Sequence, residues 1–181
     1  RLSTLLNNGQ EYKNWFALYI VRGKVALGTL HQNLYDLILE LIPTLKQMVL
    51  QWTYHYMTNL LKSVTILHSS SDRTMLRNLG KWLGCITLGK EKPIVDKRLN
   101  IKKLVCFGYA SDSLHVIIPC IVKILESLGE GSIGGDDDDR IKKNPFQLPN
   151  PWTKTLVTLL KALHQQEDVK MSVKFDIKNV L

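Results

Sequence analysis

The sequence has few of the residues that build chemical sites, and none of the spacings that such sites need. There are three cysteines, Cys85, Cys106 and Cys120, and no two of them have CxxC spacing. We therefore expect reduced thiols, those in apolar helical patterns being ordinary core residues. The most apolar run, residues 116–125, is ten residues long and contains Pro119 and Lys123. It is too short to cross a bilayer and no leader peptide is evident, so we expect an intracellular protein without a membrane partner.

Histidine and acidic residues also lack the arrangement of a catalytic or metal centre. The five histidines are scattered, with no HExxH motif, and no GxSxG elbow is present. The string GxGxxG at residues 129–134 follows a helical pattern and runs into Asp136–Asp139, whose charge would repel a nucleotide. Contiguous aspartates lack the alternate spacing of a calcium loop, so this run is interpreted as a solvated insertion. The sequence predicts no cofactor, no metal, no catalytic residue and therefore no enzyme.

Acidic residues are outnumbered, and the excess of positive charge is local. Lysine and arginine total 24 against 16 aspartate and glutamate, a net charge of +8. Residues 73–103 alone contain nine basic and two acidic residues, a local net charge of +7. Such a patch attracts an acidic protein surface or RNA phosphates. The alternative is a solvated face that keeps the protein in solution.

The residues that are present favour helices, most clearly in residues 72–92. Three side-chain types separate there onto three sides of one helix: apolar (Leu76, Leu79, Leu83, Ile86), glycine (Gly80, Gly84) and basic (Arg73, Arg77, Lys81). Steps of three and four residues make an apolar face for a core. The glycines would let another helix approach closely. Asp72 is the predicted N-cap. The positive stripe would remain outside as a docking surface.

Helical periodicity recurs along the whole chain and predicts an all-α fold of about eight helices. Further stripes cover residues 12–23, 30–41, 43–67, 101–108, 113–128, 151–163 and 173–181, with a weak strand alternative at 169–175. Tryptophans 15, 52, 82 and 152 fall at or beside core positions, and residues 129–148 are predicted to form a flexible loop. Consecutive helices would pair as hairpins and stack into a superhelix as one domain over 1–181. A compact bundle is the alternative.

Three segments carry a family resemblance: DRTMLRNLGKWLGCITLGKEKPI, VIIPCIVKILESL and NPWTKTLVTLLKALHQQEDVKMSVKFDI. They resemble the central domain of the large Not scaffold subunit of the cytoplasmic Ccr-Not deadenylase complex. That domain is similar in fold to the middle domain of translation initiation factor 4G, the MIF4G fold of HEAT-type helix pairs. The resemblance covers residues 72–128 and 149–181, extends to 10–67 and fails at 129–147. The chain is expected to begin after the family's first helix pair.

The resemblance implies a non-enzymatic scaffold with two main partners. One is a Caf-type deadenylase, a ribonuclease that shortens poly(A) tails, and the other is a DEAD-box RNA helicase held through its RecA-like lobe. Such a scaffold, with other subunits of the same complex, would couple mRNA deadenylation to translational repression and decay. We expect it in the cytoplasm, including mRNA-decay granules, with some nuclear presence.

Candidate contact residues follow from this comparison. For the helicase they are Tyr19, Arg22, Tyr35, Arg73, Arg77, Asn78 and Lys81. For the deadenylase they are Pro149, Asn150, Trp152 and Lys154. Asn150 followed by Pro151 is also an ordinary helix start, because asparagine is a preferred N-cap and proline fits the first helical position.

Two other functions remain open from the sequence. One is an RNA-binding helical-repeat module of the initiation-factor-4G type, in which residues 73–103 contact RNA directly. Binding through phosphates would weaken steeply with salt, whereas a mainly apolar protein interface would tolerate it. The other is a hydrolase built from residues far apart in the sequence, which would show turnover by the isolated domain.

Overall fold

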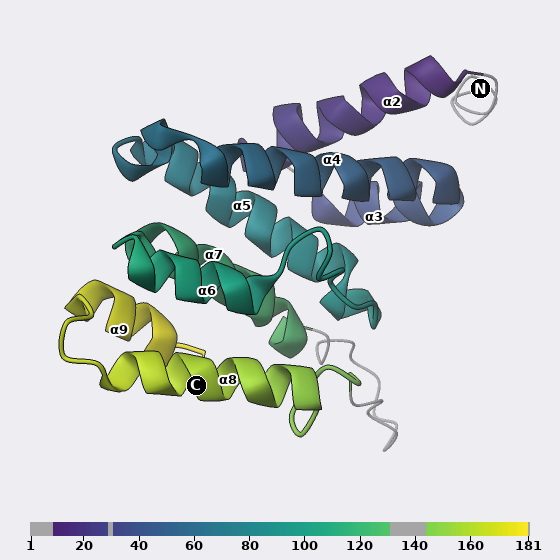
Figure 1. Cartoon of the computed structure of the whole chain (residues 1–181). Coiled ribbons are helices and arrows are strands. Elements are labelled where there is room, and N and C mark those ends of the chain that lie inside the picture. The colour runs from purple at the N-terminus through teal and green to yellow at the C-terminus, as the bar shows by residue number, and fades with distance from the viewer. Residues whose placement is uncertain (1–8, 29–30, 131–143, 181) are drawn as a thin grey trace. The chain divides into compact units, whose positions relative to one another are not determined.

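A computed structural model describes residues 9–28, 31–130 and 144–180 (Figure 1). In these ranges the chain forms eight α-helices and no strand, which confirms the all-α prediction. The helices are α2 (Gln10–Leu18), α3 (Gln32–Leu41), α4 (Pro43–Lys62), α5 (Ser70–Ile86), α6 (Ile101–Ala110), α7 (Leu114–Glu130), α8 (Pro151–Gln165) and α9 (Met171–Lys178). A π-helix, η1 (Tyr19–Val25), and two 3-10 turns, η2 (Val64–Leu67) and η3 (Leu88–Lys90), complete them.

Residues 1–79 and 80–181 form two compact units, and the division falls inside α5. In the first unit α4 packs against α2, η1 and α3. In the second, α7 packs against α6, α9 and η3, and α8 packs against α9. Helices that follow one another therefore pair as hairpins: α3 with α4, α6 with α7 and α8 with α9. The single stacked domain over 1–181 stays a prediction.

In the first unit, the buried face of α2 and η1 differs from the stripe predicted for residues 12–23, which consists of Tyr12, Trp15, Phe16, Tyr19 and Ile20. In α2 and η1 the buried side chains include Ala17, Ile20 and Val21, whereas Trp15 is 64% exposed. The helix does not end at Gly23, because η1 continues it and Ala26 N donates to Val21 O, five residues back. This wider turn shifts the side chains relative to a regular 3.6-residue repeat.

The apolar stripe predicted for residues 30–41 consists of Leu30, Leu34, Leu37, Ile38 and Leu41, and in α3 it is wrong by one position. Leu30 itself lies outside the described residues. Leu34, Leu37 and Leu41 are exposed, whereas Tyr35 and Leu39 are buried. Both sets repeat at helical spacing, and the periodicity of an apolar helix cannot say which set meets the core. Pro43 begins α4, as the stripe predicted for residues 43–67 requires, but α4 ends at Lys62 and the 3-10 turn η2 follows it.

Helix α5 begins earlier and ends earlier than expected. Asp72 is not its N-cap: the helix starts at Ser70, and Ser69 Oγ accepts the Asp72 N–H at 3.1 Å. The Asp72 carboxylate instead accepts a hydrogen bond from Thr65 Oγ1 at 2.7 Å. The helix ends at Ile86 rather than Lys92, followed by η3. The predicted apolar face is confirmed, since Leu76, Leu79, Leu83 and Ile86 are all buried.

In the second unit, the close helix approach predicted at the two glycines of α5 is confirmed, and the helix that approaches them is α7. A Cβ added to Gly80 would stand 2.7 Å from Cys120 O, and one added to Gly84 would stand 2.7 Å from Ser127 Oγ. A proline inside a helical pattern can either kink the helix or mark the point where the helix begins. Helix α7 begins at Leu114, so Pro119 lies inside it and is not its first residue. Burial raises the pKa of the Cys120 thiol to about 12, so at neutral pH it is an uncharged core residue.

The segment before α8 is more ordered than the loop predicted for residues 129–148. Residues 131–143, including Asp136–Asp139, lie outside the described residues. Beyond them, Asn144 Nδ2 donates to Leu88 O and Gln147 Nε2 donates to Leu128 O, both at 2.7 Å. Asn150 then caps α8, as predicted. The weak strand alternative is wrong, because Met171 starts α9.

Candidate protein-docking surfaces

An open groove of about 400 Å³ lies on the first unit, and we call it the aromatic groove. It is lined by Trp15, Leu18, Tyr19, Arg22, Gly23, Leu27, Tyr56 and Met75. Its residues come from α2, η1, the residues just after η1, α4 and α5. Apolar and aromatic side chains predominate, with Arg22 as the charged member.

The aromatic side chains of this groove are held in position by each other. The Trp15 and Tyr19 rings stack with centroids 5.8 Å apart and an interplanar angle of 14°. Lys24 Nζ lies 5.5 Å from the centroid of the Tyr19 ring, which adds positive charge at this place. Exposed tryptophan, tyrosine and arginine side chains are the residues that contribute most at protein interfaces. The arrangement suits a partner that offers apolar groups beside negative charge.

The structure brings together only part of the predicted helicase set. Tyr19 and Arg22 share the aromatic groove. Tyr35 is 9% exposed and belongs to the core, and Asn78 Nδ2 donates to Ala26 O at 3.0 Å. Arg73 Nη1 donates to Ile66 O and Leu67 O at 3.2 and 2.9 Å, tying η2 to α5.

Those three side chains therefore have roles within the fold, while two basic members stay on the surface. Arg77 is exposed and donates to Thr74 Oγ1 one turn earlier, and Lys81 is exposed further along α5. Sequence reasoning missed Trp15, which it assigned to the core. The available signal was the three-residue and four-residue spacing of Tyr12, Trp15 and Tyr19, which places three large rings on one side of the helix.

A second open groove, of about 340 Å³, lies on the second unit beside the start of α8, and we call it the corner groove. It is lined by Leu125, Glu126, Leu128, Gly129, Gln147, Leu148, Thr153, Val157, Asn179 and Val180. Leu148 is 49% exposed and is followed by the exposed Pro149, and the exposed Lys154 comes directly after the lining residue Thr153 in sequence. An apolar patch next to a lysine is thus available to a partner.

The predicted deadenylase residues divide between structural and surface positions. Asn150 Oδ1 accepts the N–H groups of Trp152 and Thr153, and its Nδ2 donates to Pro145 O at 2.8 Å. Trp152 is half-buried with its ring edge-on to Phe146, at a centroid distance of 6.4 Å. Asn150 is therefore occupied by capping, which leaves Pro149 and Lys154 as the more available contacts.

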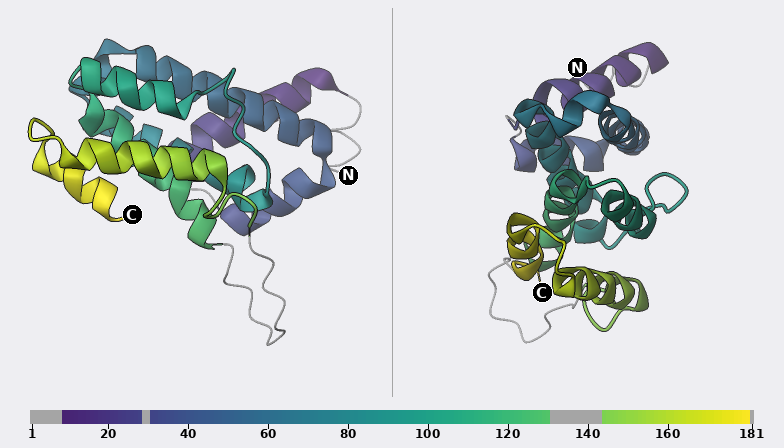
Figure 2. Two further views of the ribbon diagram at one scale, coloured as in Figure 1. Left: turned by 60° about the horizontal axis from the view of Figure 1, so that its bottom comes forward. Right: turned by 60° about the vertical axis from the view of Figure 1, so that its left-hand side comes forward.

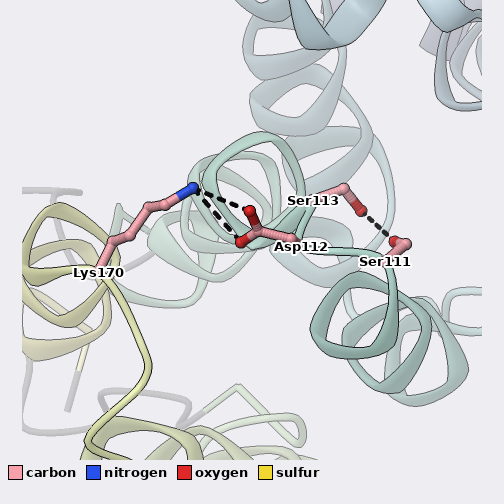
Figure 3. Close-up of polar contacts among 4 residues, drawn as sticks. All are labelled: Ser111, Asp112, Ser113 and Lys170. Carbon is pink, nitrogen blue, oxygen red and sulfur yellow. Dashed lines mark hydrogen bonds and ion pairs between the residues drawn. The ribbon is translucent and has the colours of Figure 1, made fainter.

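A polar cluster joins two turns of the second unit without forming a chemical site. Lys170 Nζ donates to both carboxylate oxygens of Asp112, at 3.2 and 3.3 Å (Figure 3). Nearby, Tyr109 OH donates to Asp168 Oδ2 at 2.9 Å, and this hydrogen bond raises the pKa of Tyr109. The cavity among them is only about 40 Å³. These bonds fasten the α6–α7 turn to the α8–α9 turn.

Metal-binding groups and membrane-spanning helices also bear on function. In the described ranges, no three His, Cys, Asp or Glu side chains come close enough to bind a metal ion together. None of the described helices combines the length and the apolarity needed to cross a bilayer.

The fold and the two grooves define the class of this protein: an all-helical module with open, largely apolar grooves on its surface. Residues 2–181 match the family described as the CCR4-NOT transcription complex subunit 1 CAF1-binding domain. The chain belongs to this family, which confirms the resemblance to the large Not subunit.

Relatives in animals and fungi support the same assignment. The chain is 31% identical over 179 residues to the CCR4-NOT transcription complex subunit let-711 of Caenorhabditis elegans, covering 95% of the chain and 6% of that protein. It is similar to the general negative regulator of transcription subunit 1 of Schizosaccharomyces pombe, at 31% over 172 residues, and of Saccharomyces cerevisiae, at 29% over 177. These two matches each cover 94% of the chain and 8% of the relative. The chain thus spans less than a tenth of these relatives.

Proposed function

We propose that this chain is a non-enzymatic docking domain that holds a Caf-type poly(A) deadenylase within the Ccr-Not complex. The observation that carries the proposal is the match of residues 2–181 to a family named for CAF1 binding. The accessible apolar grooves agree with it, because a scaffold needs surface rather than a converging set of reactive groups. Other subunits of the same complex would join the remainder of a longer scaffold.

The corner groove is the surface that we assign to the deadenylase. Its rim is preorganised: Gln147 is bonded to Leu128 O, Thr153 Oγ1 to Phe146 O, and Asn150 caps α8. A partner that docks there would order few additional side chains, which lowers the entropic cost of association. Leu148 and Val180 supply apolar contact. The exposed Lys154, which follows the lining residue Thr153 in sequence, supplies a positive charge.

Sedimentation of the purified chain with a Caf-type deadenylase tests this function. We expect a one-to-one complex that persists when the salt concentration is raised, because a mainly apolar interface depends little on screened charge. The chain alone should not shorten a poly(A) substrate. Absence of a complex at concentrations of about 10 µM, or turnover by the chain itself, would contradict the proposal.

A second partner, the DEAD-box RNA helicase, is proposed for the aromatic groove. The observation that favours it is the exposed Trp15–Tyr19 stack beside Arg22, on a unit other than the one that carries the corner groove. A scaffold that holds a deadenylase and a helicase would couple mRNA deadenylation to translational repression and decay. We propose the cytoplasm as the place of this function.

Replacing two exposed groove residues should separate the partners. We expect Tyr19→Ala with Arg22→Glu to weaken helicase binding about tenfold or more, since a central aromatic and arginine pair can contribute about 2 kcal/mol or more. The melting temperature should fall by only a few degrees, because Arg22 is exposed and Tyr19 loses only its ring contacts at the surface, worth about 1 kcal/mol. Calorimetric titration measures binding and thermal unfolding measures the melting temperature, both in parallel with Lys161→Glu, an exposed charge reversal on α8. Unchanged helicase binding, or equal loss in the Lys161 control, would remove the groove from the proposal.

A further inference from the structure

The connector from α5 to α6 and the first turn of α6 concentrate basic residues that neither groove uses. We call residues 87–103 the basic connector. Its six basic residues are Lys90, Lys92, Lys97, Arg98, Lys102 and Lys103, and its two acidic residues are Glu91 and Asp96. The whole segment belongs to the second unit. In the right-hand view of Figure 2 the connector is the teal loop that stands out from the helices.

Buried anchors hold this connector in a defined conformation. Ile94 and Leu99 are buried on either side of an exposed turn, in which Arg98 N and Leu99 N both donate to Val95 O, at 2.8 and 3.0 Å. Asn100 then caps α6 by accepting the Lys103 N–H at 2.9 Å. Lys97 and Arg98 are thus presented to solvent at a fixed place just before the helix.

Most of this charge has no internal use. In the part of the chain that the structure describes, no ion pair joins Lys92, Lys97, Arg98 or Lys103 to a carboxylate. The first turn of α6 contains two lysines and no acidic residue. Positive charge at a helix N-terminus opposes the helix dipole, so these lysines do not serve helix stability. These basic side chains are not paired with carboxylates, and those in the first turn of α6 oppose the helix dipole. They are therefore suited to binding an anion from outside the protein.

An aromatic side chain extends the basic surface along α6. Phe107 is 61% exposed and follows Lys103 by four residues, which places the two on the same face of the helix. Single-stranded nucleic acids bind where basic side chains contact phosphates and an exposed ring stacks on a base. The apolar grooves lie elsewhere, so this surface offers charge and one ring rather than a pocket for a protein side chain.

We propose that the basic connector and the outer face of α6 bind single-stranded RNA. Lys97, Arg98 and Lys103 contact successive phosphates, and Phe107 stacks on an unpaired base. The choice of RNA rests on the proposed function, which places the chain beside an enzyme that shortens poly(A) tails. The surface would keep the transcript close to that enzyme without taking part in catalysis.

Fluorescence anisotropy of the intact 181-residue chain with a labelled single-stranded RNA of about 20 nucleotides tests this proposal. We expect Lys97→Ala with Arg98→Ala to weaken binding about tenfold and to reduce the slope of log affinity against log salt by about 1.4, the value for two lost phosphate contacts. Phe107→Ala should weaken binding about fivefold or more, and Phe107→Trp should restore it. An RNA duplex of equal length should bind less tightly.

Matched controls make the proposal falsifiable. Lys62→Ala with Lys161→Ala removes the same charge from exposed positions on α4 and α8 and should leave the affinity within about twofold. An equal loss of RNA affinity in that control, or tighter binding of the RNA duplex, would overturn the proposal. Displacement of the RNA by polyglutamate at equal charge would also overturn it and would favour an acidic protein as the partner. Deadenylase binding, measured on the same variants, should be unchanged. If the deadenylase fails to bind the wild-type chain while RNA binds as described, the proposed deadenylase docking is wrong and the RNA-binding surface stands.

Discussion

Gly84→Ala is expected to destabilise the chain by about 2 kcal/mol, although alanine is the better helix former by about 1 kcal/mol. The reason is the contact between α5 and α7. A Cβ at position 84 would meet the carbonyl oxygen of Ile124 and lie 2.7 Å from Ser127 Oγ. The Ile124 carbonyl belongs to the backbone, and the Ser127 hydroxyl donates a hydrogen bond to that same carbonyl. Neither group can therefore move away at low energetic cost. One of the helices must shift.

Gly129→Ala is the matched control, because Gly129 is also helical but, among the described residues beyond its own stretch of helix, no atom lies within 4 Å of an added Cβ. There the higher helix propensity of alanine should stabilise by up to about 1 kcal/mol. Urea unfolding followed by circular dichroism measures both changes, and the two glycines should give opposite signs. A neutral or stabilising Gly84→Ala would contradict the close packing of α5 on α7.

Leu148→Asp combined with Lys154→Glu is expected to weaken deadenylase binding by at least about tenfold. The first change puts a charge on the apolar rim of the corner groove, and burying an unpaired carboxylate against a partner is strongly unfavourable. The second change, Lys154→Glu, reverses an exposed charge on α8 directly after the lining residue Thr153. Both side chains are exposed, so the free energy of unfolding should change by no more than about 0.5 kcal/mol.

Asn150→Ala provides the contrast for this surface. Loss of the N-cap bonds to Trp152 and Thr153 should lower stability by about 1 kcal/mol. Deadenylase affinity should nevertheless remain within about threefold, because the Asn150 amide is occupied inside the protein. If Asn150→Ala abolishes binding of the folded chain while the double variant does not, the corner groove is not the docking surface.

Local sequence rules predicted those features that depend on neighbours along the chain. Pro43 begins α4, Asn150 caps α8, and the Leu76–Ile86 stripe faces a core, because each depends on backbone chemistry or on periodicity within one helix. The close approach at Gly80 and Gly84 was also predictable, since paired glycines four residues apart leave a flat helix face. The partner helix, α7, could not be named in advance.

Features that depend on tertiary packing were mostly missed. The face of α3 is wrong because two apolar sets compete, and only contact with α4 decides between them. The π-helix at Tyr19–Val25 was not predicted, and Trp15 is exposed because α2 buries its opposite face, which carries Lys13 and Ala17. Tyr35, Arg73 and Asn78 were predicted as contact residues, yet Tyr35 lies in the core and the other two side chains donate to three backbone carbonyls. A side chain suited to binding a partner is equally suited to binding its own backbone.

Hydrogen–deuterium exchange of the chain with and without a Caf-type deadenylase shows whether the corner groove holds this enzyme. We expect slowed exchange in residues 147–157 and 177–180, which border the corner groove, and little change in residues 10–28 around the aromatic groove. Protection confined to residues 10–28, or exchange that the deadenylase leaves unchanged throughout the chain, would contradict it.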